Sequence, residues 1–385
     1  MEVEAKLINL MKEYYEKVDY CIGYPVCRYP NVSGFGEWYA KTGLCDIAVN
    51  NAGNPFDGEQ LLLNSTAIER DVIRTFAPLY GIPEGREWGF VTNSGTDGNM
   101  HGIYFGAKIL QKKTGMLPIV YISKEAHYSA SRICDVQNLE TRMIDYDKYG
   151  RMDPDSFRKN LDPTKPALIV FAIGSTFMGA TDDQQAIQKV LDEVKPIAVY
   201  KHLDGALFGG YLPFTEYKDI VNMQKQGYDS IAISGHKFFG IDEPSGLFLS
   251  RKDVIEAQGS FKVTYLNNDM PLINCSRSGL TPLKFYWLLK HVGWDKFEKE
   301  AAEMLKNTEY LQQKFDEIGY PAWHLPYSNT LFFKRPAEWI RQKYMLACGY
   351  MEEYGGELTH IVVMQHVTKR IIDEFISDLV SSLNE

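Results

Sequence analysis

Seven short apolar segments, most of them separated by helical patterns, constrain the fold of this 385-residue chain more than any other feature. They lie near residues 88–93, 119–123, 141–146, 167–174, 198–204, 229–234 and 245–250. Apolar runs of this length, bounded by small residues, are typical of buried parallel strands. Their alternation with helices predicts an α/β fold: a mostly parallel seven-stranded sheet with helices on both faces and ligands at the carboxyl ends of the strands.

Two further parts flank this sheet. Residues 1–60 are expected to form an arm rich in Gly, Pro, Asn and Tyr, preceded by a helix that packs on a partner subunit through Leu7, Leu10, Met11 and Tyr14. Residues 61–284 form the large domain. Residues 285–385 are expected to form a smaller C-terminal α+β domain, with strands near 330–334 and 360–364 and a final amphipathic helix.

For two helices of the large domain, the sequence predicts which residues face solvent or are buried. A helix from about Ser65 through Phe76 is expected to carry its charges, Glu69, Arg70, Asp71 and Arg74, on the exposed side. The helix that follows residues 94–96 is expected to bury a stripe made of Met100, Ile103, Ala107 and Leu110.

Charge, the N-terminal sequence and the cysteines indicate which binding partners, cellular location and metal or disulfide sites to expect. The net charge is −9, which argues against nucleic acid or an anionic membrane as the main partner. The acidic start lacks the basic and apolar regions of a signal peptide, and no apolar stretch approaches the roughly 20 residues that span a bilayer. A cytoplasmic location is therefore expected. Six scattered cysteines without a CxxC pair predict reduced thiols, with no disulfide framework and no metal site.

Lys237 stands directly after the apolar segment 229–234, in Ser234-Gly-His-Lys-Phe-Phe-Gly240. An ammonium group at the end of a buried strand is costly unless it is paired, whereas a lysine amine can form a Schiff base with an aldehyde cofactor. Ser234 and His236 are polar enough to hold a phosphate or an aromatic ring beside it. By itself, a His-Lys pair is more often an exposed surface feature.

Two other strand ends carry residues that suit the same cofactor. Asp204 ends the segment 198–204 and could accept a hydrogen bond from a protonated pyridine nitrogen, which makes pyridoxal phosphate an electron sink. Ser94, Gly95 and Thr96 form a small-residue turn before a helix, where backbone N–H groups could cradle a phosphate. Phosphate turn, acid and lysine, in that order at three strand ends, predict a pyridoxal phosphate enzyme.

Seven motifs extend this pattern along nearly the whole chain. They are Gly23-Tyr-Pro25, Asn93-Ser-Gly-Thr-Asp-Gly-Asn99, Ser123-Lys-Glu-Ala-His-Tyr-Ser129, Gly174-Ser-Thr-Phe-Met-Gly-Ala180, His202-Leu-Asp-Gly-Ala206, Ser234-Gly-His-Lys237 and Ser276-Arg-Ser-Gly279. With them the chain resembles the group II pyridoxal phosphate amino-acid decarboxylases, most closely the branch of bacterial histidine decarboxylases and plant serine decarboxylases. The resemblance implies the aspartate-aminotransferase-like fold (fold type I) and a homodimer, or a higher homo-oligomer, with shared active sites.

The resemblance also implies roles for single residues. His127 would stack on the pyridine ring and act with Lys237 and Asp204 in catalysis, and Tyr24 and Pro25 would contact the substrate. Arg277 could bind the phosphate of the partner's cofactor or the substrate carboxylate, or it could form an interface salt bridge.

Two features of the motifs leave alternatives open. Ser175 and Thr176 could donate hydroxyl hydrogens to the ring 3-oxygen, or the turn could simply cap a helix. The stretch Ile241-Asp-Glu-Pro-Ser-Gly246 departs from the proline-rich turn of the relatives. Its two acids could change the charge of the pocket.

The activity implied is decarboxylation of an L-amino acid to a primary amine and carbon dioxide, with histidine as the first choice of substrate and histamine as the product. Serine or another amino acid is the alternative. Two further alternatives are a pyridoxal phosphate carbon–carbon lyase, for which no extra basic cluster is evident, and a cofactor-binding protein without turnover, against which the intact Asp204, His127 and Lys237 argue.

Overall fold

A computed structural model describes residues 2–58, 61–259, 261–263 and 268–383. The chain divides into two compact units. The larger consists of residues 30–176 and 180–298, and the smaller of residues 1–29, 177–179 and 299–385. Residues 30–58 and 285–298 therefore group with the larger unit. The division of the chain after residues 60 and 284 stays a prediction.

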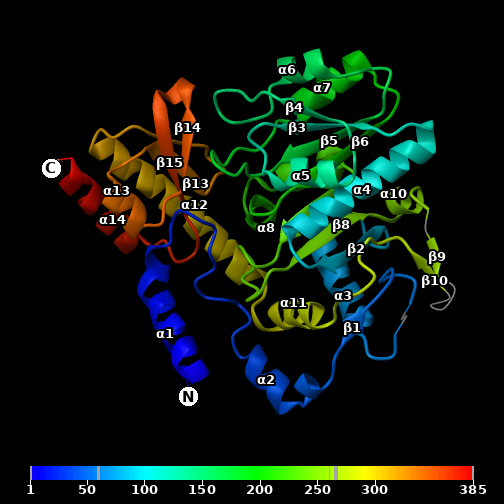
Figure 1. Ribbon diagram of the computed structural model, residues 1–385, viewed down its shortest axis with the longest axis horizontal. Helices are drawn as coiled ribbons and strands as arrows, with labels where there is room; N and C mark the ends of the chain where they lie inside the picture. Colours follow the sequence, from blue (N-terminus) through cyan, green and yellow to red (C-terminus); the bar gives the residue numbers. More distant parts are fainter. Residues whose placement is uncertain (1, 59–60, 260, 264–267, 384–385) are drawn as a thin grey trace. The chain divides into compact units, whose positions relative to one another are not determined.

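The larger unit is built on a seven-stranded sheet (Figure 1). Its strands are β2 (Glu87–Thr92), β3 (Ile119–Ser123), β4 (Thr141–Ile144), β5 (Ala167–Ala172), β6 (Val199–Asp204), β7 (Ser230–Ser234) and β8 (Gly246–Arg251), in the order β2-β8-β7-β6-β5-β3-β4. Only β8 runs against its neighbours β2 and β7, and the other pairs are parallel. The predicted α/β class and the seven predicted strands are confirmed. Every residue of β2, β3, β5 and β7 is buried, as expected for a sheet covered on both faces.

The larger unit also contains helices and two pairs of short strands. The helices are α2 (Phe35–Lys41), α3 (Thr66–Phe76), α4 (Gly95–Thr114), α5 (Ser129–Val136), α6 (Pro154–Asn160), α7 (Gln184–Val194), α8 (Phe208–Tyr211), α9 (Met223–Gln226), α10 (Lys252–Glu256) and α11 (Leu280–His291). The short strand pairs are β1 (Asn50–Asn51) with β11 (Arg277–Ser278), and β9 (Phe261–Val263) with β10 (Asn268–Met270). Helix α12 (Trp294–Glu317) begins in the larger unit and continues in the smaller.

Helix α4 approaches the sheet unusually closely because glycines face it. A Cβ atom at Gly98 would lie 2.7 Å from the Cβ of Ala232 on β7, and one at Gly102 would lie 2.2 Å from the ring of His202 on β6. The next residue of β7, Ile233, points to the opposite face, where it packs near Gly209 of α8. Helices therefore cover both faces. Of the stripe predicted for α4, Ile103, Ala107 and Leu110 are buried and Met100 is half-buried, but the glycine face was not predicted.

The smaller unit contains a four-stranded antiparallel sheet in the order β12-β13-β15-β14. Its strands are β12 (Ala322–His324), β13 (Thr330–Lys334), β14 (Cys348–Met351) and β15 (Gly356–Val362), and its other helices are α1 (Glu2–Lys17), α13 (Glu338–Lys343) and α14 (Lys369–Ser382). The strand predicted at 330–334 is confirmed, whereas the one predicted at 360–364 begins and ends earlier. Phe315, Leu331, Phe333 and Phe375 belong to one core between sheet and helices. Within the described residues, no helix is long and apolar enough to cross a membrane.

Candidate active site

The predicted cofactor residues of the larger unit follow the carboxyl ends of five strands that run in one direction. The turn 94–96 follows β2, His127 follows β3, Ser175 follows β5, Asp204 ends β6, and Lys237 follows β7. Because carboxyl ends of parallel strands share one edge of a sheet, these residues gather at that edge.

Lys237 and Asp204 influence each other electrostatically at this edge. Burial lowers the pKa of Lys237 below its usual value, and the Asp204 carboxylate partly opposes the shift. Asp204 is 8% exposed, and its Oδ1 accepts a hydrogen bond from the Ala206 N–H at 3.2 Å. A lysine whose ammonium form is disfavoured loses its proton more easily, and the neutral amine is the form that attacks an aldehyde.

His127 lies within electrostatic reach of both residues. Burial is the main cause that lowers its pKa, Asp204 raises it, and Lys237 lowers it further. The Ser129 N–H donates to His127 Nδ1 at 3.3 Å, and the Ser129 hydroxyl lies 2.8 Å from the same nitrogen. An N–H group can only donate, so Nδ1 is an acceptor and the neutral imidazole carries its proton on Nε2. Ser129 was not predicted to have a role, because a sequence motif does not reveal which ring nitrogen a side chain contacts.

The turn before α4 has the geometry of an anion site. Ser94 is the N-cap, and its Oγ accepts from the Asp97 N–H at 3.1 Å. The first backbone N–H groups of a helix have no partner within the helix and favour an anion. A Cβ atom at Gly95 would lie 2.5 Å from Ser234 Oγ, so only glycine lets the helix start approach the end of β7 this closely. Thr96 is exposed.

The remaining polar residues at this edge are held by local contacts. The Ala180 N–H donates to Ser175 Oγ at 3.1 Å, while helix α7 is capped by Asp183, which accepts from the Ala186 N–H at 2.9 Å. The turn at Ser175 and Thr176 therefore does not cap α7. His236 Nδ1 accepts from the Ser245 N–H at 3.3 Å, and burial lowers the pKa of His236.

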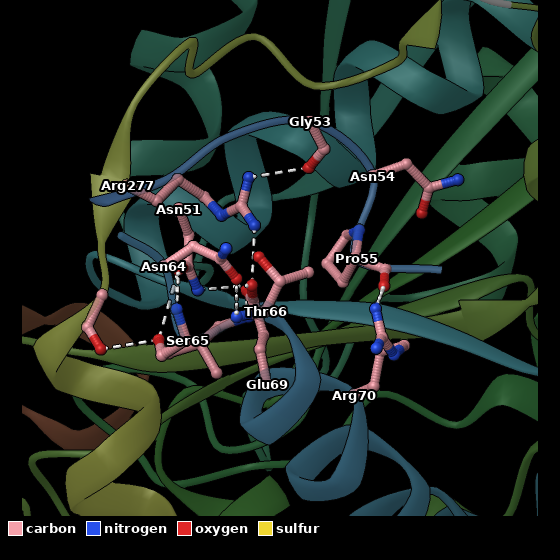
Figure 2. A network of polar contacts seen from close by, with 12 residues as sticks. Asn51, Gly53, Asn54, Pro55, Asn64, Ser65, Thr66, Glu69, Arg70 and Arg277 are labelled. Atoms are coloured by element: carbon pink, nitrogen blue, oxygen red, sulfur yellow. Dashed lines mark hydrogen bonds and ion pairs between the residues drawn. The ribbon is translucent and has the colours of Figure 1, made fainter. Parts of the chain in front are cut away.

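Arg277 belongs to a buried network within the chain (Figure 2). Its Nη2 donates to Glu69 Oε2 at 2.8 Å and its Nη1 to the Gly53 carbonyl at 3.0 Å, and the side chains of Arg277 and Glu69 are each 1% exposed. Glu69 also accepts from the Val91 N–H at 2.8 Å and from Asn51 Nδ2 at 2.9 Å. One expectation is corrected: Glu69 does not lie on the exposed side of its helix, since its side chain is buried. The role of Arg277 at a partner's cofactor, a substrate carboxylate or an interface stays a prediction. The partner that makes burial of Glu69 tolerable is over 200 residues away in the chain, where helical periodicity cannot reveal it.

The acids of the unusual stretch 241–246 are also paired. Lys284 Nζ lies 2.7 Å from Asp242 Oδ1 and 3.3 Å from Glu243 Oε2. The Thr281 hydroxyl donates to Glu243 Oε1 at 3.0 Å. Helix α11 therefore supplies one cation that pairs with both acids and offsets one of their two negative charges.

Tyr24 and Pro25 lie in the smaller unit, whereas the residues described above lie in the larger. Tyr24 is 50% exposed. The backbone just before it lies against His360, whose Nε2 is 3.0 Å from the Gly23 carbonyl oxygen and whose Nδ1 is 2.9 Å from the Phe177 carbonyl oxygen. Across the described ranges, no group of three or more His, Cys, Asp or Glu side chains is arranged to hold a metal ion.

Known proteins with similar sequences bear on this site. A family model described as the pyridoxal-dependent decarboxylase conserved domain matches residues 106–320. Serine decarboxylase 1 of Oryza sativa subsp. japonica is 32% identical over 98% of this chain and 76% of its own length. The chain belongs to the pyridoxal-dependent decarboxylase family. Another relative of this decarboxylase is the histidine decarboxylase of Morganella morganii, which is 31% identical over 88% of this chain and 87% of its own length. That of Acinetobacter baumannii (strain AYE) is 31% identical over 95% and 94%.

Solved structures with the same fold include enzymes of different chemistry. The decarboxylase matches L-methionine decarboxylase from Streptomyces sp. 590 with a TM-score of 0.80 at 19% identity, over 98% of this chain and 95% of the other. It matches sphingosine-1-phosphate lyase from Burkholderia pseudomallei K96243 with a TM-score of 0.80 at 16% identity, over 100% and 90%. These matches confirm fold type I. Family membership makes pyridoxal phosphate the cofactor and amino-acid decarboxylation the reaction.

Proposed function

We propose that this decarboxylase converts L-histidine to histamine and carbon dioxide. The supporting observation is that histidine decarboxylases from three bacteria, Morganella morganii, Acinetobacter baumannii and Vibrio anguillarum, match 88–95% of this chain. Identity does not separate the two groups, since it is 31% to the histidine enzymes and 32% to the serine enzymes. Serine is therefore the second candidate.

The residues at the sheet edge fit pyridoxal phosphate. The free N–H groups at the start of α4, beside Ser94, Gly95 and Thr96, suit its phosphate, and Ser234 closes that end of the site. Asp204 suits the protonated ring nitrogen, and the amine of Lys237 suits the aldehyde. When bound, the cofactor supplies a conjugated cationic ring that accepts the electron pair of the breaking bond between Cα and the carboxylate.

The protein groups have separate tasks around that ring. Lys237 would hold the aldehyde of the cofactor through its amine, and Asp204 would keep the ring nitrogen protonated. His127 would stack on the ring, and its proton is on Nε2 because Nδ1 accepts from the Ser129 N–H. Ser175 accepts a hydrogen bond from the Ala180 N–H and so keeps its own hydroxyl hydrogen available for the ring 3-oxygen. Thr176 and His236 border the same site.

Tyr24 and Pro25 are proposed as substrate contacts because the family resemblance implies that role. The Gly23 carbonyl before Tyr24 lies 3.0 Å from His360 Nε2, and the Tyr24 side chain is exposed. A cytoplasmic location stays a prediction.

Substrate identity is tested by mixing the purified, cofactor-loaded protein with single L-amino acids while carbon dioxide and amine are measured. L-histidine is expected to give equimolar carbon dioxide and histamine with the highest kcat/KM. Faster formation of ethanolamine from L-serine would keep the reaction and replace the substrate. Consumption of a substrate by carbon–carbon cleavage without carbon dioxide would identify a lyase. A visible cofactor band without turnover of any amino acid would identify a silent binding protein.

We also propose a homodimer in which the subunits share their active sites. Leu7, Met11 and Tyr14 of α1 are 56%, 53% and 61% exposed, and an apolar helix face of this kind gains free energy when a second subunit covers it. Native mass spectrometry is expected to give twice the chain mass, and dilution is expected to reduce specific activity as monomers form. A monomer with full activity would contradict the shared site.

A further inference from the structure

The carboxylate of Asp97, in the first turn of α4, connects two separate parts of the chain. Its Oδ2 accepts from the backbone N–H of Asn93 at 2.9 Å and from Asn93 Nδ2 at 3.2 Å. Its Oδ1 accepts from Asn274 Nδ2 at 2.8 Å. One buried carboxylate therefore holds both the residue that opens the phosphate turn and a residue that is 177 positions away.

His101, one helical turn further on, reinforces this connection. Its ring is 0% exposed, and its Nε2 accepts from the backbone N–H of Ile273 at 3.1 Å. Nδ1 therefore carries the proton and faces Asp97, lying 2.9 Å from its carbonyl oxygen and 3.2 Å from its Oδ1. Asp97 and His101 thus bind two consecutive residues, 273 and 274, which lie just before the strand that carries Arg277.

Electrostatics alone predicts that Asp97 weakens cofactor binding. A carboxylate within one turn of a bound phosphate repels it, because like charges at this range disfavour each other. Burial raises the pKa of Asp97, but the hydrogen bonds from His101, Asn93 and Asn274 outweigh it and lower the pKa overall, so the group is charged at neutral pH. A buried negative charge next to an anion site therefore disfavours cofactor binding unless the carboxylate stabilises the site in another way.

We propose that Asp97 is a positioning residue: through Asn93 it fixes the phosphate-binding turn 93–96, and through His101 and Asn274 it fastens residues 273–274 to the same helix start. Retention of the cofactor then depends on Asp97 although the side chain does not touch the phosphate. The inference rests on the proposed placement of the cofactor phosphate at Ser94–Thr96.

Charge repulsion alone predicts that Asp97→Asn lowers the Kd for pyridoxal phosphate, whereas the positioning role predicts that it raises the Kd. An amide has one acceptor oxygen and places an NH₂ group against donors that the carboxylate satisfied. Positioning therefore predicts a Kd raised by about 10- to 100-fold and faster cofactor release, because bonds to a charged group contribute strongly. The kcat at saturating cofactor should stay within about threefold of wild type, since Asp97 takes no part in the chemical step. The readouts are absorbance titration of the apoenzyme and steady-state rates. An unchanged or lower Kd overturns the proposal.

Two further variants make the test independent of folding defects. Asn274→Ala removes only the connection to residue 274 and should raise the Kd for pyridoxal phosphate about fivefold or more. An unchanged Kd for this variant also overturns the proposal, even if Asp97→Asn does not fold. The matched control is Asp229→Asn, since Asp229 accepts from the Lys201 N–H at 2.8 Å before the amino end of β7 and should affect stability without changing the Kd. If the wild-type protein itself binds no cofactor, it is the proposed function that fails.

Discussion

Replacing Lys237 with alanine should lower kcat for decarboxylation by about a thousandfold or more, the scale seen when a covalent catalytic group is removed. Lys237 stands at the end of β7, and its pKa is lowered by burial, so its amine is available to hold the aldehyde of the cofactor. Steady-state rates with saturating pyridoxal phosphate measure the loss. Borohydride reduction followed by peptide mass analysis should place the cofactor on the Lys237 peptide of the wild-type protein and nowhere in the variant.

Lys201→Ala is the matched control for this substitution. Lys201 is also a lysine on a neighbouring strand, β6, and burial lowers its pKa too, but its Nζ donates to Gln188 Oε1 at 2.8 Å. The variant should keep borohydride trapping at Lys237 and most of the activity. A Lys237→Ala protein that turned over as fast as wild type would contradict the assignment of the covalent lysine.

Replacing Arg277 with methionine should lower the free energy of unfolding by about 3–5 kcal/mol, because it leaves the Glu69 carboxylate buried without its cation. The methionine keeps the length of the side chain, so the loss reports the ion pair more than the lost volume. Urea denaturation followed by fluorescence measures it. The same contacts join Gly53 and β11 to α3, so the arm near residues 51–53 should become more sensitive to protease (Figure 2).

A double-mutant cycle isolates the pair. The variant Glu69→Gln with Arg277→Met should be more stable than Arg277→Met alone, since no uncompensated charge remains buried. Lys41→Met is the surface control: Lys41 pairs with Glu37 in an exposed position, and its loss should leave the free energy of unfolding nearly unchanged. If Arg277→Met were no more destabilising than Lys41→Met, the buried pair would not be a main stabilising contact of this region.

The parts of the fold that were correctly predicted depend on local patterns. Strands such as β5 and β7 were recognisable as short, mostly apolar runs because burial on both faces of a sheet favours apolar residues along the whole strand. The start of α4 was recognisable because an N-cap serine and small residues act within one helical turn. The cofactor followed from the order of such strand ends in the chain and the family from the resemblance of seven motifs, and the comparisons confirm both.

The errors arose where a residue's role depends on a distant partner. The sequence pattern predicts Glu69 to be a surface charge on an amphipathic helix. It is buried instead, and its ion pair with Arg277 makes this burial tolerable. A search for apolar stripes does not detect the glycine face of α4, because these glycines act by allowing His202 and Ala232 to approach the helix closely. Asp242 and Glu243 read as free acids until Lys284 of α11 is placed beside them.

The α/β class, the strand ends that carry Asp204 and Lys237, and the cofactor that such residues suit are predictable from sequence, because each depends on neighbours within a few positions. The folded chain is needed to establish which charges are buried, which nitrogen of His127 carries its proton, and which segments hold the phosphate turn in place. Those properties arise from contacts such as Asp97 with Asn274, which join residues far apart in the chain and leave no periodic trace in either segment.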